Sequence, residues 1–338
     1  MAVRRARIAG VGKYLPPRVV TNDDLAEMME TSDEWIRQRT GIETRHWLEG
    51  NDCASDMAVH AAKQALDDAG VKPEDVQMVV FATTSPDHEF PGTGCFFQTK
   101  MGIPAGTASL DIRQACTGFI YALSIADQFI RGGVYDRVLV IGSESQSKSL
   151  DKTDAGRDMA VLFGDGAGAV VVESTVVDGE DDAQIFSSHL HADGKYAKEL
   201  WMDAPTQTEP GERITHAMID EGRHYPQMNG KLVFVHASKR MPESVMEALE
   251  ANGKSIDDLD MLFFHQANLR INQQVAKGLG VPDDKVFNTI QKYGNTTAAT
   301  IPIGMRDAID EDVLKPGMLV GLSAFGSGFT WASTLLRF

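Results

Sequence analysis

The 338-residue chain has few cysteines and no long apolar run. Its three cysteines, Cys53, Cys95 and Cys116, are too few for a disulfide scaffold, so we expect a reducing, cytoplasmic environment. No stretch approaches the ~20 apolar residues of a membrane span. Residues 1–15 lack the apolar core of a signal peptide, so we also expect no membrane insertion and no secretion.

Basic residues are scarce relative to acidic ones, with 32 Lys and Arg against 48 Asp and Glu and a net charge of −16. A field of that sign repels phosphate backbones and anionic membrane surfaces, so nucleic acid is a poor candidate partner. The composition is otherwise that of a globular protein, with 43% hydrophobic and 24% charged residues. At roughly 150 residues per domain, the length predicts about two domains.

Short apolar runs typical of buried strands alternate with segments whose apolar residues recur every three to four positions. This alternation predicts an α/β protein with mostly parallel sheets. We interpret residues 178–182 as a connection between two halves and residues 203–212 as a surface excursion. The predicted strands are Met78–Thr83, Arg137–Ile141, Ala169–Val172, Met261–Phe264 and Leu319–Leu322, and the predicted helices are Asp56–Ala69, Gly118–Ile130, Pro242–Ala251 and Leu269–Leu279.

Two segments of the chain resemble each other. Residues 65–82 (ALDDAGVKPEDVQMVVFA) align without a gap on residues 248–265 (ALEANGKSIDDLDMLFFH). Each segment is typical of a helix that ends near a glycine, a short loop and a buried strand. Any two units of this kind look somewhat alike; the alternative, which the length favours, is a duplication that produced two halves of similar topology.

Three patterns that often mark ligand sites are incomplete. Residues 8–15 (IAGVGKYL) lack the third glycine of a dinucleotide-binding turn. Residues 164–172 (GDGAGAVVV) precede their apolar run and contain no Lys-Ser/Thr pair, so tight packing explains their glycines better than phosphate binding does. The histidines form no His-Glu-x-x-His pair, so we expect no metal site.

Three polar residues stand where chemistry is plausible. Cys116 precedes an amphipathic helix, where the helix dipole is expected to lower the pKa of the thiol below about 8.5. His265 follows the predicted strand 261–264, and Asn295 lies in a Gly-Asn-Thr turn. The turn at 323–331 can present backbone N–H groups to an oxyanion. A lone cysteine is also common as a small buried core residue. The presence of His265, Asn295 and the turn at 323–331 is what favours a nucleophile.

These motifs carry a family resemblance. ACTGFIYAL, LFGDGAGAVVV, HQANLRI, YGNTTAATIP and AFGSGFTW follow one another in the chain, with TSDEWIRQRTGI near its start. In this order they resemble β-ketoacyl-acyl carrier protein synthase III, a thiolase-fold condensing enzyme. The resemblance implies duplicated βαβαβαββ halves that form an α-β-α-β-α five-layer sandwich. Residues 1–177 would form the half with the nucleophilic cysteine, and residues 178–338 the half with the histidine and asparagine.

The resemblance implies a decarboxylating Claisen condensation that starts fatty-acid synthesis. An acyl-CoA primer would load Cys116, and malonyl-acyl carrier protein would then lose CO2 and attack the acyl group. His265 and Asn295 would stabilise the enolate by hydrogen bonds, and the backbone N–H groups of Cys116 and Ser327 would form the oxyanion hole. No metal or organic cofactor is implied.

The same matching implies a tunnel for the acyl-CoA. Trp35 would stack on the adenine with Arg157 opposite, and the pantetheine arm would pass Thr31, Gly230 and Asn268. An exposed tryptophan packed on a neighbouring helix is the plainer alternative for Trp35.

Further residues are assigned by resemblance to the carrier protein and to the acyl group. Arg39 and Arg270 would dock the acidic carrier protein, which requires a locally basic mouth in a chain of net charge −16. Phe90 and Phe325 would line the acyl pocket. Because the residue matching Phe90 acts across a subunit interface in this family, a homodimer is implied.

The chain departs from the family pattern in three places. Ser327 stands where glycine is usual, Val235 replaces a tunnel-mouth lysine, and residues 201–225 are longer than in the short form of the family. Thr84 stands where the related hydroxymethylglutaryl-CoA synthases need a glutamate, which argues against that activity. The departures leave open a relative that serves a specialised pathway with a longer or unusual acyl donor. A non-catalytic partner subunit is disfavoured, because the cysteine, histidine and asparagine are all retained.

Overall fold

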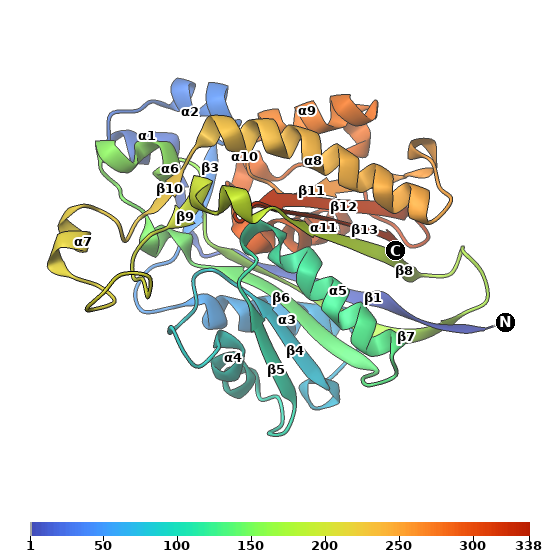
Figure 1. The fold of residues 1–338 in the computed structure, drawn as a ribbon. Helices are drawn as coiled ribbons and strands as arrows, with labels where there is room; N and C mark the ends of the chain where they lie inside the picture. The colour runs from blue at the N-terminus through green and yellow to red at the C-terminus, as the bar shows by residue number, and fades with distance from the viewer. Residues whose placement is uncertain (1) are drawn as a thin grey trace.

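Two mixed β-sheets organise the computed structural model, which describes residues 2–338 (Figure 1). The first sheet has the strand order β1-β7-β6-β4-β5, and the second has the order β8-β13-β12-β11. The strands of the first sheet are β1 (Val3–Tyr14), β4 (Met78–Ala82), β5 (Ala108–Ile112), β6 (Arg137–Glu144) and β7 (Gly166–Val177). Those of the second are β8 (Gln184–Ala192), β11 (Met261–Phe264), β12 (Leu319–Gly326) and β13 (Thr330–Arg337).

The two sheets repeat one topology. In each, the first strand pairs antiparallel with the last, the last pairs antiparallel with the one before it, and that strand lies beside a parallel neighbour. In the first sheet, β5 pairs parallel with β4. At the corresponding edge of the second sheet, Val286 forms a single parallel bridge to Leu262 of β11. The glycines of the repeated segment, Gly70 and Gly253, both have positive φ at a helix end, 65° and 62°. The duplication seen in the sequence therefore reflects two similarly built halves.

Helices complete five layers, α-β-α-β-α, which is the fold class that the sequence predicted. The helices α3 (Ala54–Ala69) and α4 (Thr93–Met101) cover the outer face of the first sheet, and α8 (Gly230–Ala251) and α9 (Leu269–Leu279) cover that of the second. Between the sheets lie α5 (Gly118–Arg131) and α11 (Thr300–Asp310), whose apolar faces join the largest buried cluster.

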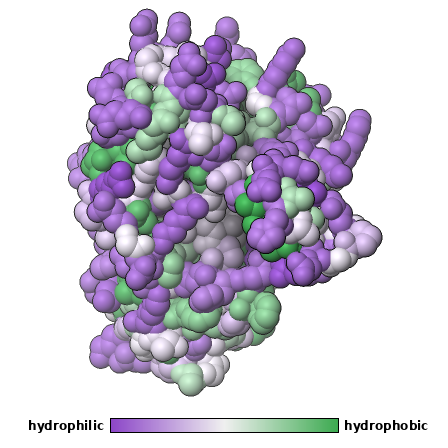
Figure 2. All heavy atoms as spheres, turned by 90° about the vertical axis from the view of Figure 1, so that its left-hand side faces the viewer, coloured by the Kyte–Doolittle hydropathy of each residue, from purple (hydrophilic) through white to green (hydrophobic). Residues whose placement is uncertain are grey.

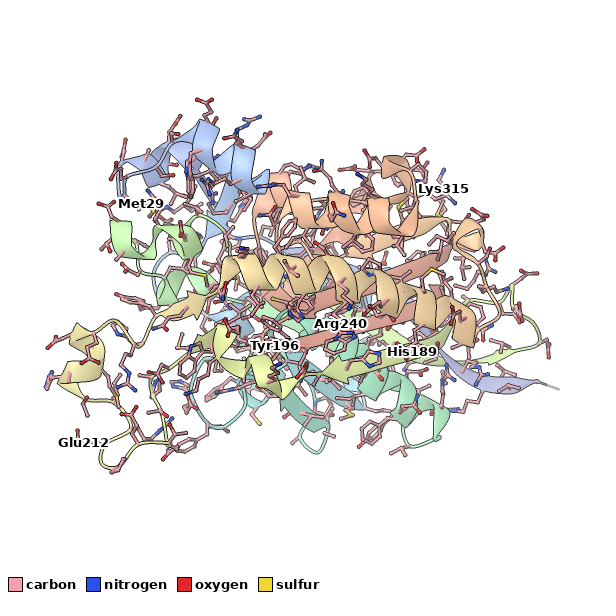
Figure 3. The ribbon with its side chains drawn as sticks, turned by 45° about the horizontal axis from the view of Figure 1, so that its top comes forward. Met29, His189, Tyr196, Glu212, Arg240 and Lys315 are labelled. Atoms are coloured by element: carbon pink, nitrogen blue, oxygen red, sulfur yellow. The ribbon has the colours of Figure 1, made fainter. Side chains whose placement is uncertain are left out.

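Smaller elements gather at one end of the sandwich, at the left of Figure 1. They include β9 (Leu200–Met202), which pairs antiparallel with β10 (Pro226–Met228). Between β9 and β10 the chain makes the excursion that contains Glu212, which lies away from the sheets in Figure 3. The others at or near this end are β2 (Arg18–Thr21), β3 (Thr44–Trp47), α1 (Asn22–Ala26), α2 (Asp33–Thr40), α6 (Arg157–Ala160), α7 (His216–Asp220) and α10 (Ile290–Tyr293).

Two sequence predictions about the fold are wrong. The sheets are mixed rather than mostly parallel, because β7 and β13 run antiparallel to both of their neighbours. Helix α8 begins at Gly230 rather than at Pro242, and the proline lies inside it. None of the helices that the structure describes is long and apolar enough to cross a membrane.

Candidate active site

Cys116 lies in a short 3-10 turn, η2 (Ala115–Thr117), between β5 and the start of α5. Its side chain is 8% exposed. The preceding residue, Ala115, has a φ of 45°, a conformation that residues other than glycine seldom adopt and that tends to mark functional sites. Cys116 faces a cavity of about 690 Å³, which His265 and Asn295 also line. The structure thus brings together the three residues of the predicted triad.

The end of β12 packs directly against Cys116. A Cβ atom on Gly326 would lie 2.7 Å from Cys116 Cβ and 3.1 Å from Cys116 N, so only glycine fits. On the other side of the turn, the Oγ1 atoms of Thr117 and Thr330 lie 2.8 Å apart and link η2 to β13. These contacts fix the nucleophile's turn to the second half of the molecule.

His265 follows β11 and is 2% exposed. Its backbone N–H donates to Ser323 O at 2.9 Å, and Nδ1 lies 2.8 Å from Thr300 Oγ1. Nε2 is buried and has no hydrogen-bond partner in the described chain. Burial lowers the pKa of His265 to about 3, so the imidazole is neutral. A neutral ring with an unpartnered nitrogen beside a cavity is suited to hydrogen-bond a substrate.

Asn295 precedes the 3-10 turn η8 (Thr297–Ala299) that leads into α11. Its backbone N–H donates to Leu162 O at 2.8 Å, and its Oδ1 accepts from Thr297 N at 2.8 Å. With the acceptor end of the amide held in this way, the Nδ2 donor remains for the cavity. Thr297 has a φ of 50°, so backbone strain lies beside Asn295 as it does beside Cys116.

The prediction of a lowered Cys116 pKa is wrong for the substrate-free protein. Burial raises the pKa of the thiol to about 12, and the charge of Glu144 adds to the rise. The helix pattern therefore gave the wrong direction for the pKa, because burial decides the protonation state of the Cys116 thiol.

The cavity opens through a rim that carries unpaired positive charge. Arg39, Lys231 and Arg270 all line it, and none of them forms an ion pair with any residue in the range 2–338. Figure 2 looks onto this end of the molecule and shows a hollow near the middle, bordered mainly by hydrophilic residues. The charge of −16 is thus not uniform, and the mouth is locally basic.

Trp35 stands at this rim with two guanidinium groups over its ring. Arg39 lies 4.7 Å and Arg157 5.0 Å from the ring centroid. Arg157 does not line the cavity itself; its Nη1 donates to Glu30 O at 2.8 Å. The structure brings Trp35 and Arg157 together, as the tunnel assignment requires, but with Arg157 on the indole face.

Of the three residues assigned to the pantetheine arm, two line the cavity. Gly230 and Asn268 line the cavity and Thr31 does not. The side chain of Asn268 caps α9: Oδ1 accepts from Arg270 N at 2.9 Å, and Nδ2 donates to Arg39 O at 3.0 Å. Asn268 therefore holds the backbone of Arg39 and Arg270, two of the three basic residues of the rim, in position.

A second cavity of about 360 Å³ also reaches Cys116, and His265 does not line it. Ser327 lines this cavity, and Phe325 is a buried wall of the first one. Phe90 lines neither and is 81% exposed. Sequence reasoning did not find the second cavity, because its walls come from segments far apart in the chain.

Two polar residues of the site were also missed. Thr300 contacts His265, and its motif, NTTAATIP, was noted without a role for this hydroxyl. Glu144, at the buried end of β6, accepts hydrogen bonds from Thr84 N and Ser85 Oγ, at 3.1 and 2.7 Å. Burial raises the pKa of Glu144 to about 7. An acidic residue directly after the largely apolar run 138–142 and Ser143 was the available signal.

Known proteins with similar sequences agree with this picture. The family described as 3-oxoacyl-[acyl-carrier-protein (ACP)] synthase III matches residues 110–194, and the C-terminal family of the same name matches residues 249–338. The chain is 45% identical to the β-ketoacyl-[acyl-carrier-protein] synthase III of Methylococcus capsulatus, over 99% of each chain. It is 43% identical to that of Xanthomonas campestris, over 98% of each chain.

A solved structure is also similar. The crystal structure of 3-oxoacyl-[acyl-carrier-protein] synthase III from Aquifex aeolicus VF5 superposes with a TM-score of 0.88 at 40% identity, covering 98% of this chain and all of the other. Fold and cavity together define the class, a thiolase-like condensing enzyme. More particularly, the chain belongs to the β-ketoacyl-[acyl-carrier-protein] synthase III family and is an acyltransferase. The predicted family, fold class and enzyme class are confirmed.

Proposed function

We propose that this protein joins an acyl-CoA primer to malonyl-acyl carrier protein at Cys116, with loss of CO2, and so starts fatty-acid synthesis. The family to which the chain belongs supports this reaction. The observation that carries its assignment to particular residues is the convergence of Cys116, His265 and Asn295 on one cavity with an unpaired basic rim.

The first half-reaction loads the enzyme. Cys116 sulfur attacks the thioester carbonyl, the new carbon–sulfur bond forms, and the bond to CoA breaks. Because the Cys116 pKa is near 12 in the free protein, the thiol proton leaves during the attack and ends on the departing CoA sulfur. The backbone N–H groups of Cys116 and Ser327 hold the oxyanion that forms in between.

The second half-reaction consumes malonyl-acyl carrier protein. As the malonyl carboxylate leaves as CO2, its electron pair becomes an enolate whose thioester oxygen accepts hydrogen bonds from His265 Nε2 and Asn295 Nδ2. The enolate carbon attacks the acyl-Cys116 carbonyl, and the cysteine sulfur departs as a thiolate and takes a proton from water. Both donors are neutral, in accord with a His265 pKa near 3. The products are CO2 and a 3-oxoacyl-acyl carrier protein.

The rim residues bind the carriers. Trp35 stacks on the CoA adenine once Arg157 moves off the indole and lies against the other face of the base. Gly230 and Asn268 border the path of the pantetheine arm, and Thr31, which does not line the cavity, is the third residue assigned to this path. Arg39 and Arg270 attract the acidic carrier protein.

Two further assignments concern assembly and location. The protein acts as a homodimer, a proposal that the unpaired sheet edge at β5 and the exposed side chain of Phe90 support. Residues 1–177 form the half with the nucleophile and residues 178–338 the half with the two donors. We place the protein in the cytoplasm, in keeping with its three unpaired cysteines.

Separate assays of the half-reactions test these roles. We expect His265→Ala and Asn295→Ala to lose malonyl decarboxylation by at least about 100-fold while Cys116 still accepts an acyl group. His60→Ala, which removes a histidine stacked on Tyr14 far along the chain from the site, is the control. Equal loss of both half-reactions would contradict the division of roles. A wild-type enzyme loaded only by long or unusual acyl-CoAs would favour the specialised-pathway alternative.

A further inference from the structure

Two cavities meet at Cys116, and the short strand β9 contributes to the walls of both. The cavities share Cys116, Met159, Phe163 and Leu200 as walls. Leu200 is the first residue of β9, and the next two residues of that strand line only the second cavity. The position of β9 therefore sets how widely the second cavity opens toward the nucleophile.

Strand β9 has little backbone support of its own. It has three residues, and its only strand partner among residues 2–338 is β10, in a two-stranded sheet separate from the two large ones. Both β9 and β10 lead into the exposed excursion around Glu212 (Figure 3). A three-residue strand in such a sheet is marginal by itself, so side chains must hold it in place.

Ser327 supplies one such contact. Its Oγ donates a 2.5 Å hydrogen bond to Leu200 O. Its own carbonyl accepts from Thr330 Oγ1 at 2.9 Å, and Thr330 Oγ1 lies 2.8 Å from Thr117 Oγ1, next to the nucleophile. A continuous set of contacts thus ties the wall at Leu200 to the turn that carries Cys116.

We propose that the Ser327 hydroxyl is a positioning residue that holds β9 close to Cys116 and thereby limits the length of the acyl chain that the second cavity admits. The walls of that cavity are mainly apolar and include Trp201 and Met202, although Glu89 and Arg113 also line it, so its apolar part suits a hydrocarbon chain. The inference rests on the proposed function, and it adds a role for the side chain of Ser327 beside that of its backbone N–H.

The test measures acylation of Cys116 by intact-protein mass spectrometry with a series of straight-chain acyl-CoAs from acetyl to decanoyl. Ser327→Ala removes the hydroxyl and keeps Cβ and the backbone N–H. We expect the ratio of the octanoyl to the acetyl rate to rise at least about fivefold, the effect of one hydrogen bond. Ser327→Gly removes the same hydroxyl and should shift the ratio in the same direction, which covers a failure of the alanine variant to fold.

Ser188→Ala is the matched control, since it removes a part-buried hydroxyl 2.7 Å from Thr334 Oγ1 and lines neither cavity. Its chain-length ratio should equal that of the wild type. An unchanged ratio in both Ser327 variants, or an equal fall at every chain length, would overturn the proposal. Failure of the wild type to accept any acyl-CoA would instead overturn the proposed function.

Discussion

The Nδ1 atom of His265 lies 2.8 Å from the hydroxyl oxygen of Thr300, which is also 3.1 Å from Thr297 O. When Thr300 donates to Nδ1, the imidazole proton must sit on Nε2, the nitrogen that has no other partner in the described chain. That tautomer is the one that can donate to a substrate oxygen. Whether the single hydroxyl proton of Thr300 goes to Nδ1 or to Thr297 O therefore decides which tautomer of His265 the protein holds.

Thr300→Val should slow malonyl decarboxylation by roughly 10- to 100-fold and leave Cys116 acylation nearly unchanged, because only the second half-reaction uses the Nε2 proton. Thr300→Ser, which restores the hydroxyl, should recover most of the rate. The comparison is made by following CO2 release and acyl-enzyme formation in parallel. A valine variant with normal decarboxylation would show that Thr300 does not control the tautomer.

The buried histidine predicts a pH dependence of stability. The folded protein keeps His265 neutral down to a pKa of about 3, whereas the unfolded chain binds a proton near pH 6.5. Between these values the unfolded state binds more protons, so the contribution of His265 to stability is lost as the pH falls through that window. Urea unfolding at pH 7.5 and pH 5 should show a smaller loss for His265→Gln than for the wild type. An equal loss would contradict the depressed pKa.

Cys116 should react slowly with iodoacetamide at neutral pH and increasingly fast up to at least pH 10, because burial and the charge of Glu144 raise its pKa to about 12. Glu144→Gln removes the charge and should speed alkylation at pH 8 several-fold. A Cys53→Ser, Cys95→Ser background confines the reaction to Cys116. A plateau in the alkylation rate below pH 8 would mean that the thiol is already ionised.

The close approach of β12 to the nucleophile predicts the effect of one added methyl group. Gly326→Ala would place Cβ 2.7 Å from Cys116 Cβ, so the turn η2 must shift, and we expect Cys116 acylation to fall by about 100-fold. Gly194→Ala, where nothing lies within 4 Å, is the control and should react normally. Acylation of Gly326→Ala at the normal rate would show that the turn yields without loss of geometry.

Much of the fold could be predicted because the apolar periodicity was strong. Helix α9 runs over Leu269–Leu279 as predicted, and β11 over Met261–Phe264. Strand direction could not be predicted, since a strand buried on both faces has the same apolar run whether parallel or antiparallel. Helix α8 was predicted too short because Pro242 resembles a helix start.

The residues of the site were likewise predictable in part. Motifs of consecutive residues indicated Cys116, His265 and Asn295, which the fold brings to one cavity. Contacts between distant segments have no motif in the sequence, and the hydrogen bond between Ser327 and Leu200 spans 127 positions. The pKa of Cys116 could not be predicted either, because burial outweighs the helix dipole that the local sequence suggested.

The most direct test of the account follows the acyl group on Cys116. The protein is incubated with a short acyl-CoA, the cysteine-containing peptide is measured by mass spectrometry, and malonyl-acyl carrier protein is then added. We predict that the acyl mass appears on Cys116 alone, is absent in Cys116→Ser, and disappears as CO2 and a 3-oxoacyl-acyl carrier protein form. An acyl group on another residue, or one that malonyl-acyl carrier protein does not remove, would contradict the assignment of Cys116 as the nucleophile of the condensation.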